Sequence, residues 1–244
     1  MLGGVTLIIA SACVFNNYLD RGIDKKMDRT KKRALVTGEI SVTAAIIYAC
    51  VLGVLGFWLL AAYTNALTVV IGAIGIFSYV VLYGYYKRAS VHGTLIGSIS
   101  GSTSLVAGYC AVTGKFDLLA LLLFLIMAAW QMPHFYAIGI YRLKDYKEAG
   151  LPILPAKRGI AATKRQILLY IVLFALTACS LTIFDYAGYL YLIVMLVVSG
   201  LWLRLALNRS TIGDDVKWGK QIFGFSLLSL LVFCLMISIA NYLP

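Results

Sequence analysis

Eight long apolar stretches restrict what this sequence can fold into. They cover roughly residues 2–19, 41–62, 66–84, 93–112, 116–140, 165–184, 187–206 and 222–242. Each is close to the ~20 residues that an α-helix needs to cross a hydrocarbon core of ~30 Å. They lack the strict alternation of a barrel strand, and a helix is the other way to satisfy every backbone hydrogen bond in lipid. The sequence therefore predicts an all-α membrane protein, a bundle of about eight transmembrane helices in a single polytopic domain, 1–244.

The composition excludes a water-soluble globule of this length. Hydrophobic residues make up 61% of the 244 positions and charged residues 13%, whereas a soluble domain carries about 25% charged residues. The net charge of +11 follows from topology rather than from a nucleic-acid partner. With eight spans, every Lys and Arg except Lys115 falls on one side of the membrane. The positive-inside rule places that side, with its longer loops, in the cytoplasm.

An asparagine and three aspartates recur every four residues where the first span meets its loop, in NNYLDRGIDKKMD. They are Asn16, Asp20, Asp24 and Asp28. On a helix a step of four residues keeps side chains on one face, so we expect all four to lie together and to need a cation between them. The plain alternative is a solvated helix end, in which Lys25, Lys26 and Arg29 screen the aspartates.

These four residues, which we call the acidic ladder, offer only oxygen atoms as metal ligands, and this predicts the class of metal. Carboxylate and amide oxygens, without His or Cys, suit Mg²⁺ or Mn²⁺. Mg²⁺ is commonly held by one or two carboxylates together with substrate phosphates, and Arg and Lys side chains can bind the remaining phosphate charge. An acidic face, basic neighbours and a membrane bundle together predict a site for a lipid that carries a diphosphate.

The segment NNYLDRGID resembles the NxxxDxxxD signature of the UbiA superfamily of intramembrane prenyltransferases. Four further stretches resemble one branch of it, the protoheme IX farnesyltransferases (heme O synthases): YGYYKR, VHGTLIGSISGS, WQMPHFYAIGIYRLKDYKEAGLPILP and RTKKRALVTGEIS. The resemblance runs in order along essentially the whole chain. It implies the UbiA-type prenyltransferase fold, which typically has nine transmembrane helices, so we expect the first helix of that pattern to be absent here.

The resemblance also implies an activity. Members of this branch transfer a farnesyl group from farnesyl diphosphate to the vinyl group of heme b (protoheme IX), which gives heme O and releases diphosphate. It implies Mg²⁺ or Mn²⁺ as cofactor, a bacterial inner membrane with its lipid, and partners in heme A synthase or terminal oxidase assembly. Two alternatives stay open: an aromatic or quinone-precursor acceptor, and a non-catalytic transporter or scaffold.

The family motifs can be placed on individual residues. Asn16, Asp20 and Asp24 match the first motif, which holds the prenyl diphosphate with Mg²⁺. Tyr83 and Lys87 match a YxxxK element that faces the diphosphate. The resemblance thus implies diphosphate contacts from these residues and their basic neighbours: Asn16, Arg21, Tyr83, Lys87, Arg88, Arg142 and Lys144.

A second acidic loop echoes the first. Asp145 stands where the superfamily carries its second aspartate motif, with Glu148 three residues on. The spacing from Asp145 to Gly159 equals that from Asp24 to Gly38, which indicates two halves that bring two acidic loops together. The resemblance makes Asp145 a metal ligand beside the first motif. The candidate catalytic residues are Asp20, Asp24, Asp145 and Lys87, which the resemblance implies, and His134, which its place inside a span suggests.

A histidine lies inside the fifth span, where His134 follows Pro133. Proline opens the local backbone ladder, and an ionisable residue at membrane depth is a functional candidate by default. Two interpretations of His134 stay open. It is a heme-binding ligand or acid/base group, or it is hydrogen-bonded to a carbonyl that Pro133 frees.

Two further patterns concern packing. Glycines 93, 97, 101 and 108 recur at about helical spacing, and small residues let membrane helices approach closely; the alternative is room for a porphyrin or a prenyl tail. Trp130, Trp202 and Trp218 lie near segment ends, which predicts positions in the aromatic belt of the membrane interface.

Overall fold

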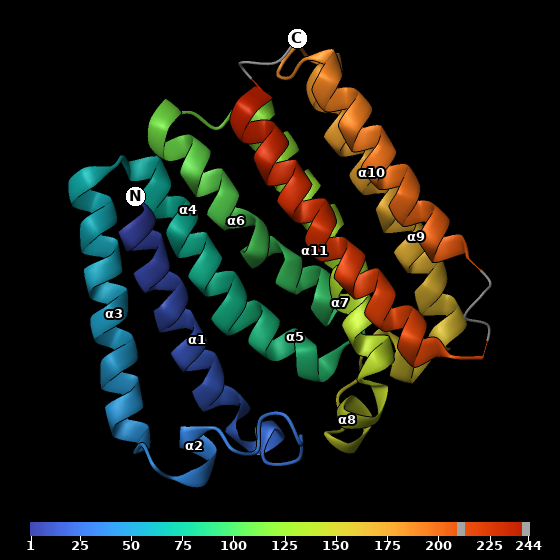
Figure 1. Ribbon diagram of the computed structural model, residues 1–244. Helices are drawn as coiled ribbons and strands as arrows, with labels where there is room; N and C mark the ends of the chain where they lie inside the picture. The colour runs from blue at the N-terminus through green and yellow to red at the C-terminus, as the bar shows by residue number, and fades with distance from the viewer. Residues whose placement is uncertain (209–212, 241–244) are drawn as a thin grey trace. The chain divides into compact units, whose positions relative to one another are not determined.

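The computed structural model describes residues 1–208 and 213–240, and within these ranges the secondary structure is helical, without a β-strand. Eight helical segments are long and apolar enough to cross a membrane (Figure 1). They are Leu2–Asp24, Val42–Tyr63, Ala66–Ala89, Gly93–Thr113, Leu118–Tyr141, Leu154–Ile183, Tyr189–Leu207 and Asp215–Ile239. The prediction of an all-α protein with about eight membrane-spanning helices is confirmed for the described chain.

Most spans are single helices. The single ones are α1 (Leu2–Asp24), α3 (Val42–Tyr63), α6 (Gly93–Thr113), α7 (Leu118–Tyr141), α10 (Tyr189–Leu207) and α11 (Asp215–Ile239). The segment α9 (Leu154–Ile183) is kinked at Gly159, whose backbone is not helical (φ 81°). The third span joins α4 (Ala66–Phe77), a π-helical segment η1 (Ser78–Tyr83) and α5 (Gly84–Ala89). Two short helices, α2 (Ala34–Thr37) and α8 (Leu143–Glu148), lie in the two longer loops.

Polar residues between the apolar runs set where the spans begin. Ser41, Asn65, Asp117 and Asp214 are the N-caps of α3, α4, α7 and α11. In each case the side-chain oxygen accepts a hydrogen bond from a backbone N–H of the first turn, at 2.9–3.1 Å. These bonds satisfy donors that the helix itself leaves open.

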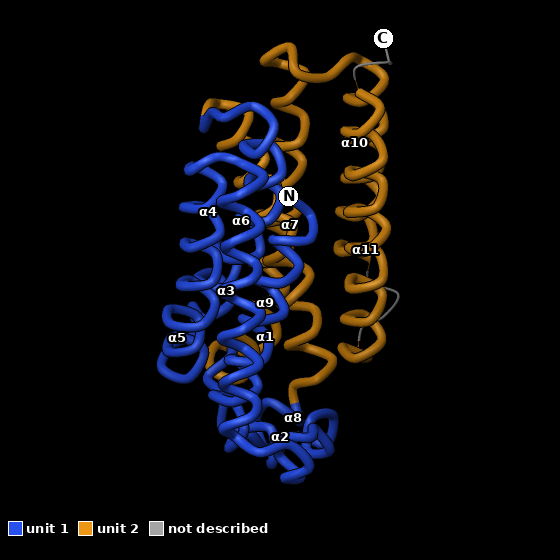
Figure 2. Tube along the Cα trace, turned by 90° about the vertical axis from the view of Figure 1, so that its left-hand side faces the viewer, with its two compact units in different colours: residues 1–116, 144–153 blue, residues 117–143, 154–244 orange. Residues whose placement is uncertain are grey.

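The chain divides into two compact units, coloured separately in Figure 2. Unit 1 comprises residues 1–116 and 144–153, and unit 2 comprises residues 117–143 and 154–244. The second acidic loop therefore belongs to the same unit as the first. That residues 1–244 form a single domain stays a prediction.

Unit 1 is held together by close approach of helix backbones. A Cβ atom on Gly4 of α1 would lie 3.0 Å from the carbonyl oxygen of Gly56 of α3, and the converse distance is 2.9 Å. About two helical turns further on, the Ser11 hydroxyl donates to the Ala49 carbonyl at 2.7 Å. Small residues thus bring α1 and α3 side by side (Figure 1), which fixes the helix that carries the acidic ladder.

Unit 2 buries the three tryptophans that the sequence assigns to the membrane interface. Trp130, Trp202 and Trp218 are 7%, 0% and 2% exposed, so the belt prediction is wrong. Trp130 Nε1 donates to the Ser226 carbonyl at 2.7 Å, and the Trp202 ring packs edge-on against Phe174. Partners on neighbouring helices decide the position of these rings, and hydropathy along the chain does not reveal such partners.

Candidate functional site

The acidic ladder lies at one end of α1. Asn16, Asp20 and Asp24 occupy successive turns of the helix, and both aspartates are buried. Asp28 does not share their face, because α1 ends at Asp24 and the chain turns there, with Met27 N donating to Asp24 O at 3.2 Å. Asp28 is 77% exposed and pairs with Lys31. The prediction that all four residues lie together is wrong for Asp28.

Asp20 is held by two cations from the third span. Lys87 Nζ donates to Oδ2 of Asp20 and to Oδ1 of Asn16, both at 2.6 Å. Arg88 Nη2 donates to the other carboxylate oxygen of Asp20 at 3.0 Å. Burial of a carboxylate is tolerated when it is paired and hydrogen-bonded, and both oxygens of Asp20 meet that condition.

The π-helical turn η1 precedes these cations. Such turns insert an extra residue into a helix and are frequent at functional sites. The rings of Tyr79 and Tyr83 stack with centroids 5.6 Å apart, and Lys87 Nζ lies 5.0 Å from the centroid of Tyr83. Tyr83 and Lys87, matched to one motif in the sequence, therefore face the Asn16–Asp20 part of the ladder together.

Glycines of α6 make room for this arrangement. A Cβ atom on Gly97 would lie 2.9 Å from the Tyr83 ring, and one on Gly93 would lie 2.8 Å from Cα of Lys87. The packing interpretation is confirmed at these two positions. Gly101 instead lines a cavity; that such room serves a porphyrin or a prenyl tail stays a prediction.

Asp24 is paired with Arg33, a residue that the sequence analysis missed. Arg33 Nη1 donates to Oδ2 of Asp24 at 2.7 Å; the Asp24 side chain is 5% exposed and that of Arg33 34%. A series of turns folds the loop back, with Thr30 N donating to Met27 O and Arg33 N to Thr30 O, both at 3.0 Å. Nothing in the run RTKKR distinguishes Arg33 from its basic neighbours.

The second acidic loop approaches the first. The pKa of the Asp28 carboxyl is lowered by the hydrogen bond and the charge of Lys31, and further by the charge of Lys144. Tyr146 of the same loop interacts electrostatically with Tyr83. These interactions support the prediction that two acidic loops come together. Asp145 lies in α8 of this loop, within unit 1.

Arg21 and Arg142 are two other predicted diphosphate ligands. Arg21 is exposed on α1. Arg142 follows the last turn of α7 in unit 2, with its guanidinium 5.6 Å from the ring centroid of Tyr141. The roles of both as diphosphate ligands stay predictions.

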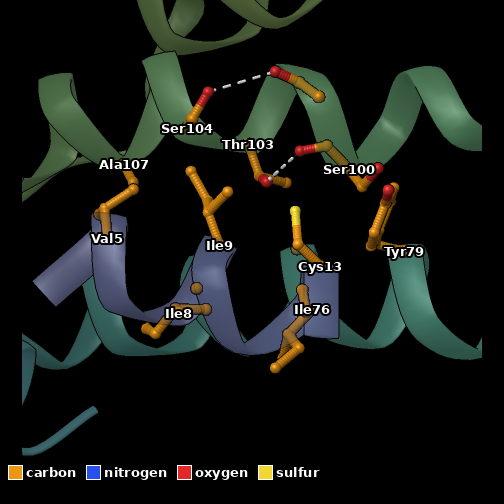
Figure 3. A pocket seen from close by; sticks show the side chains of 14 residues that line it. Val5, Ile8, Ile9, Cys13, Ile76, Tyr79, Ser100, Thr103, Ser104 and Ala107 are labelled. Carbon is orange, nitrogen blue, oxygen red and sulfur yellow. Dashed lines mark hydrogen bonds between the residues drawn. The ribbon is translucent and has the colours of Figure 1, made fainter. Parts of the chain in front are cut away.

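An apolar cavity of about 240 Å³ lies in unit 1 among α1, α4 and α6 (Figure 3). Its lining is Val5, Ile8, Ile9, Ala12, Cys13, Gly72, Gly75, Ile76, Tyr79, Ser100, Gly101, Thr103, Ser104 and Ala107. Val5, Ile9 and Cys13 follow one another at the helical spacing that Asn16 continues, so the cavity runs along α1 towards the ladder. Tyr79 joins the two regions, because it lines the cavity and stacks on Tyr83.

The oxygen donors of the ladder fit a hard cation whose coordination is completed by the substrate. In residues 1–208 and 213–240 no group of three or more His, Cys, Asp or Glu side chains is placed to hold a metal ion. Asn16, Asp20 and Asp24 nevertheless offer one amide and two carboxylate functions on consecutive turns. Mg²⁺ characteristically uses one or two carboxylates, water and substrate phosphate. The donor set therefore suits Mg²⁺ or Mn²⁺ bound together with a diphosphate.

His134 links two helices of unit 2. Its Nδ1 lies 2.8 Å from Ser226 Oγ of α11, and its ring lies 4.8 Å, between centroids, from each of Trp130 and Phe223. The partner of His134 is thus a hydroxyl group of α11. A carbonyl freed by Pro133, which the structural interpretation expected, is not the partner that the structure gives.

Comparison with known proteins decides the family. Residues 1–241 match the UbiA prenyltransferase family. The chain belongs to the UbiA prenyltransferase family. Among curated members, the protoheme IX farnesyltransferases of Citrobacter koseri and of Salmonella typhimurium are each 49% identical over all 244 residues, and that of Escherichia coli O1:K1 is 48% identical. The match covers 100% of this chain and 82% of each relative.

Solved structures of UbiA-related proteins share the fold. A structure from work on digeranylgeranylglyceryl phosphate synthase aligns with a TM-score of 0.77 at 22% identity, over 96% of this chain and 81% of that one. An apo UbiA homolog from Aeropyrum pernix K1 gives 0.75 at 18%, over 99% and 88%. A UbiA homolog from Archaeoglobus fulgidus bound to GPP and Mg²⁺ gives 0.63 at 16%, over 98% and 89%. The predicted UbiA-type fold is confirmed.

Proposed function

We propose that this UbiA-family protein transfers a farnesyl group from farnesyl diphosphate to the vinyl group of heme b, giving heme O. The observation that carries the proposal is the 48–49% identity, along the whole chain, to proteins named protoheme IX farnesyltransferase. The geometry of unit 1 supports the donor half of the reaction, because an acidic ladder with basic partners lies beside an apolar cavity.

The cavity is the proposed place of the prenyl chain. From Val5 to Cys13 it follows α1 for eight residues, about 12 Å at the helical rise, and the lining there is mostly aliphatic. Burial of a hydrocarbon chain on such a surface is favourable. The diphosphate of a chain bound in this way would lie near Asn16 and Asp20.

The ladder is the proposed diphosphate site. Asn16, Asp20 and Asp24 would hold Mg²⁺ or Mn²⁺, which when bound neutralises charge that develops on the leaving diphosphate. Lys87 and Arg88 donate charge-assisted hydrogen bonds to phosphate oxygens and stabilise the same charge. Asp145 is proposed as a further metal ligand. Further diphosphate ligands are proposed from the resemblance: Arg21, Tyr83, Arg142 and Lys144.

The reaction breaks the bond between C1 of the farnesyl group and the diphosphate oxygen. One vinyl carbon of heme b forms the new bond to C1, and water adds its hydroxyl to the other vinyl carbon and releases a proton. The cation that develops on the allyl group needs surroundings that exclude water until the new bond forms. Tyr79 and Tyr83 offer π faces to it where the cavity meets the ladder.

His134 is the proposed ligand of the heme iron. The single hydroxyl hydrogen of Ser226 is directed at the Phe223 carbonyl, at 2.6 Å. Ser226 Oγ therefore accepts from His134, so the network assigns the proton to Nδ1 and leaves Nε2 with a lone pair. An unprotonated imidazole nitrogen is what iron binds.

The protein is proposed to work in a bacterial inner membrane. The distribution of Lys and Arg supports a cytoplasmic position for the loops that hold the ladder and Asp145. Its product, heme O, is the substrate class that a heme A synthase or an assembling terminal oxidase takes up, which makes these the proposed partners.

The proposal is tested with the purified chain in detergent, supplied with heme b, labelled farnesyl diphosphate and Mg²⁺. The expected product is heme O, identified by mass, and its formation should be lost on removal of Mg²⁺ with a chelator. Transfer of label to a quinone precursor but not to heme b would show that the acceptor is the quinone precursor. No transfer to any acceptor, with both substrates bound, would refute the enzymatic proposal.

A further inference from the structure

The Arg33–Asp24 pair is a built contact rather than a chance surface pair. The carboxylate is almost fully buried and lies 2.7 Å from the guanidinium. The loop that carries Arg33 is itself anchored, because Met27 and Thr30 are buried and the Thr30 hydroxyl points to the Asp24 carbonyl, at 3.3 Å. A buried carboxylate needs a partner, and in the free protein Arg33 supplies it.

Arg33 also lies near the end of the cavity. Its partner Asp24 belongs to the ladder on α1, and Asn16 of that ladder continues the helical spacing of the cavity residues Val5, Ile9 and Cys13. The guanidinium is therefore close to Asp24 and to the region where the diphosphate of a cavity-bound prenyl chain would lie.

Arg33 and a metal ion compete for Asp24. A metal ligand oxygen lies about 2.0–2.1 Å from Mg²⁺, and Oδ2 of Asp24 is already engaged by a full positive charge. A cation on the other carboxylate oxygen would lie close to the guanidinium charge, and their repulsion favours departure of the guanidinium. Its departure is unfavourable unless another anion receives it, and a diphosphate offers the paired oxygens that an arginine binds through two hydrogen bonds.

We infer that Arg33 exchanges partners when the donor substrate binds: it is the counter-ion of Asp24 in the free protein and a ligand of the diphosphate in the complex. The inference rests on the proposed function only in requiring a substrate that carries a diphosphate. It makes metal binding and diphosphate binding cooperative, and such coupling is reciprocal.

The test measures binding rather than turnover. The full chain in lipid nanodiscs is titrated with Mn²⁺, and free Mn²⁺ is followed by electron paramagnetic resonance with and without inorganic pyrophosphate; protein-free titrations correct for the complex that the two form in solution. Arg33→Gln is compared with Lys32→Gln, which removes the same charge from the adjacent, exposed position. Thermal melting verifies that both variants are folded.

Wild type should bind Mn²⁺ weakly alone and more tightly with pyrophosphate. Arg33→Gln should bind Mn²⁺ alone more tightly than Lys32→Gln does, because Asp24 is freed, and should bind pyrophosphate about tenfold more weakly, as expected for one lost charged hydrogen-bond partner. Equal behaviour of the two variants, or Mn²⁺ binding in wild type that is indifferent to pyrophosphate, would overturn the inference.

A second variant covers the case in which Arg33→Gln does not fold. Arg33→Lys keeps a positive charge beside Asp24 but loses the paired N–H donors of the guanidinium. Binding of Mn²⁺ alone should therefore be unchanged, while pyrophosphate binding weakens. Unchanged pyrophosphate binding would contradict the exchange. These assays contain no heme. A chain that shows the exchange but makes no heme O would refute the proposed acceptor and leave the inference intact.

Discussion

Lys87 Nζ lies 2.6 Å from Oδ2 of Asp20, although 67 positions separate the two residues in the chain. The same nitrogen donates to Asn16. Two sequence motifs that the resemblance matches separately, NxxxDxxxD on α1 and YxxxK on the third span, therefore form one cluster. The lysine pairs with the ladder in the free protein, and under the proposed function it binds phosphate oxygens in the complex.

Removal of this lysine charge should impair catalysis strongly. Lys87→Met keeps the apolar stem but removes the donor to Asn16 and Asp20, and loss of one preorganised donor to developing charge lowers kcat by about 10²–10³-fold. The measurement is heme O formation at saturating farnesyl diphosphate. Lys25→Met, at an exposed position just beyond α1, is the control and should stay near wild type. A Lys87→Met enzyme as active as the control would remove Lys87 from the site.

The structure separates Asp28 from the other aspartates, and this separation is testable. Asp20→Asn and Asp24→Asn each remove a carboxylate from the ladder and should reduce transfer to the detection limit. Asp28→Asn should keep transfer within about twofold of wild type, because exposed ion pairs contribute little. Loss of transfer in Asp28→Asn comparable with that in Asp24→Asn would restore the four-residue site that the spacing alone suggests.

The Asp28–Lys31 pair also has a defined pH dependence. The pKa of the Asp28 carboxyl is lowered by Lys31. Any stabilisation by the pair is therefore present above the ordinary carboxyl pKa and is lost as the pH falls through the pKa of the folded state. Because the pair is exposed, we expect the melting temperatures of wild type and Asp28→Asn to agree closely at pH 7.

The ladder illustrates what the sequence could and could not predict. A period of four correctly predicted a shared face for Asn16, Asp20 and Asp24, because helical geometry alone decides that face. It failed at Asp28 because Lys25, which follows the last turn, is neither a glycine nor a proline that would mark the helix end. Arg33 was missed because its contact with Asp24 depends on turns that no local pattern encodes.

The same distinction holds for the spans. Their number followed from hydrophobic length, which the membrane thickness dictates. The burial of Trp202 and the tyrosine stack could not be predicted, because they depend on which helices meet and in what register. The π-helical turn η1 shows this most clearly, since Tyr83 and Lys87 take their places after a change in helical period that is absent from the hydropathy pattern.

Gly97 should not tolerate a side chain. A Cβ atom there would lie 2.9 Å from Cδ2 of Tyr83, so Gly97→Ala has to shift the ring, and overpacking of this kind costs about 1–3 kcal/mol. We expect a lower melting temperature and reduced transfer. Gly200→Ala is the matched control, because a Cβ atom at that helical glycine meets nothing within 4 Å, and it should be neutral or stabilising. Equal effects of the two substitutions would show that the Tyr83 ring moves freely.

The cavity should control which prenyl chain is used. Ile9 points into it from α1 (Figure 3), so Ile9→Phe shortens the available space. The ratio of kcat/KM for farnesyl to that for geranyl diphosphate should fall by about tenfold or more, in line with the ~1–3 kcal/mol that a change of pocket size contributes. Val54→Phe, on an exposed position of α3, is the control and should leave the ratio unchanged. An unchanged ratio in Ile9→Phe would place the chain elsewhere.

Ser226 should act on heme through His134. In Ser226→Ala the imidazole loses the acceptor that fixes its proton on Nδ1, so heme binding should weaken and the Soret band of bound ferric heme should shift, whereas His134→Ala should lose the ligated spectrum. Loss of the interhelical hydrogen bond should also lower stability by roughly 0.6–1.7 kcal/mol. Ser229→Ala is the matched control, because the buried Ser229 hydroxyl donates to the Phe225 carbonyl of its own helix, at 2.9 Å. If His134→Ala lowers the melting temperature but leaves the heme spectrum unchanged, the histidine serves to hold α7 against α11 and the iron ligand has to be sought elsewhere.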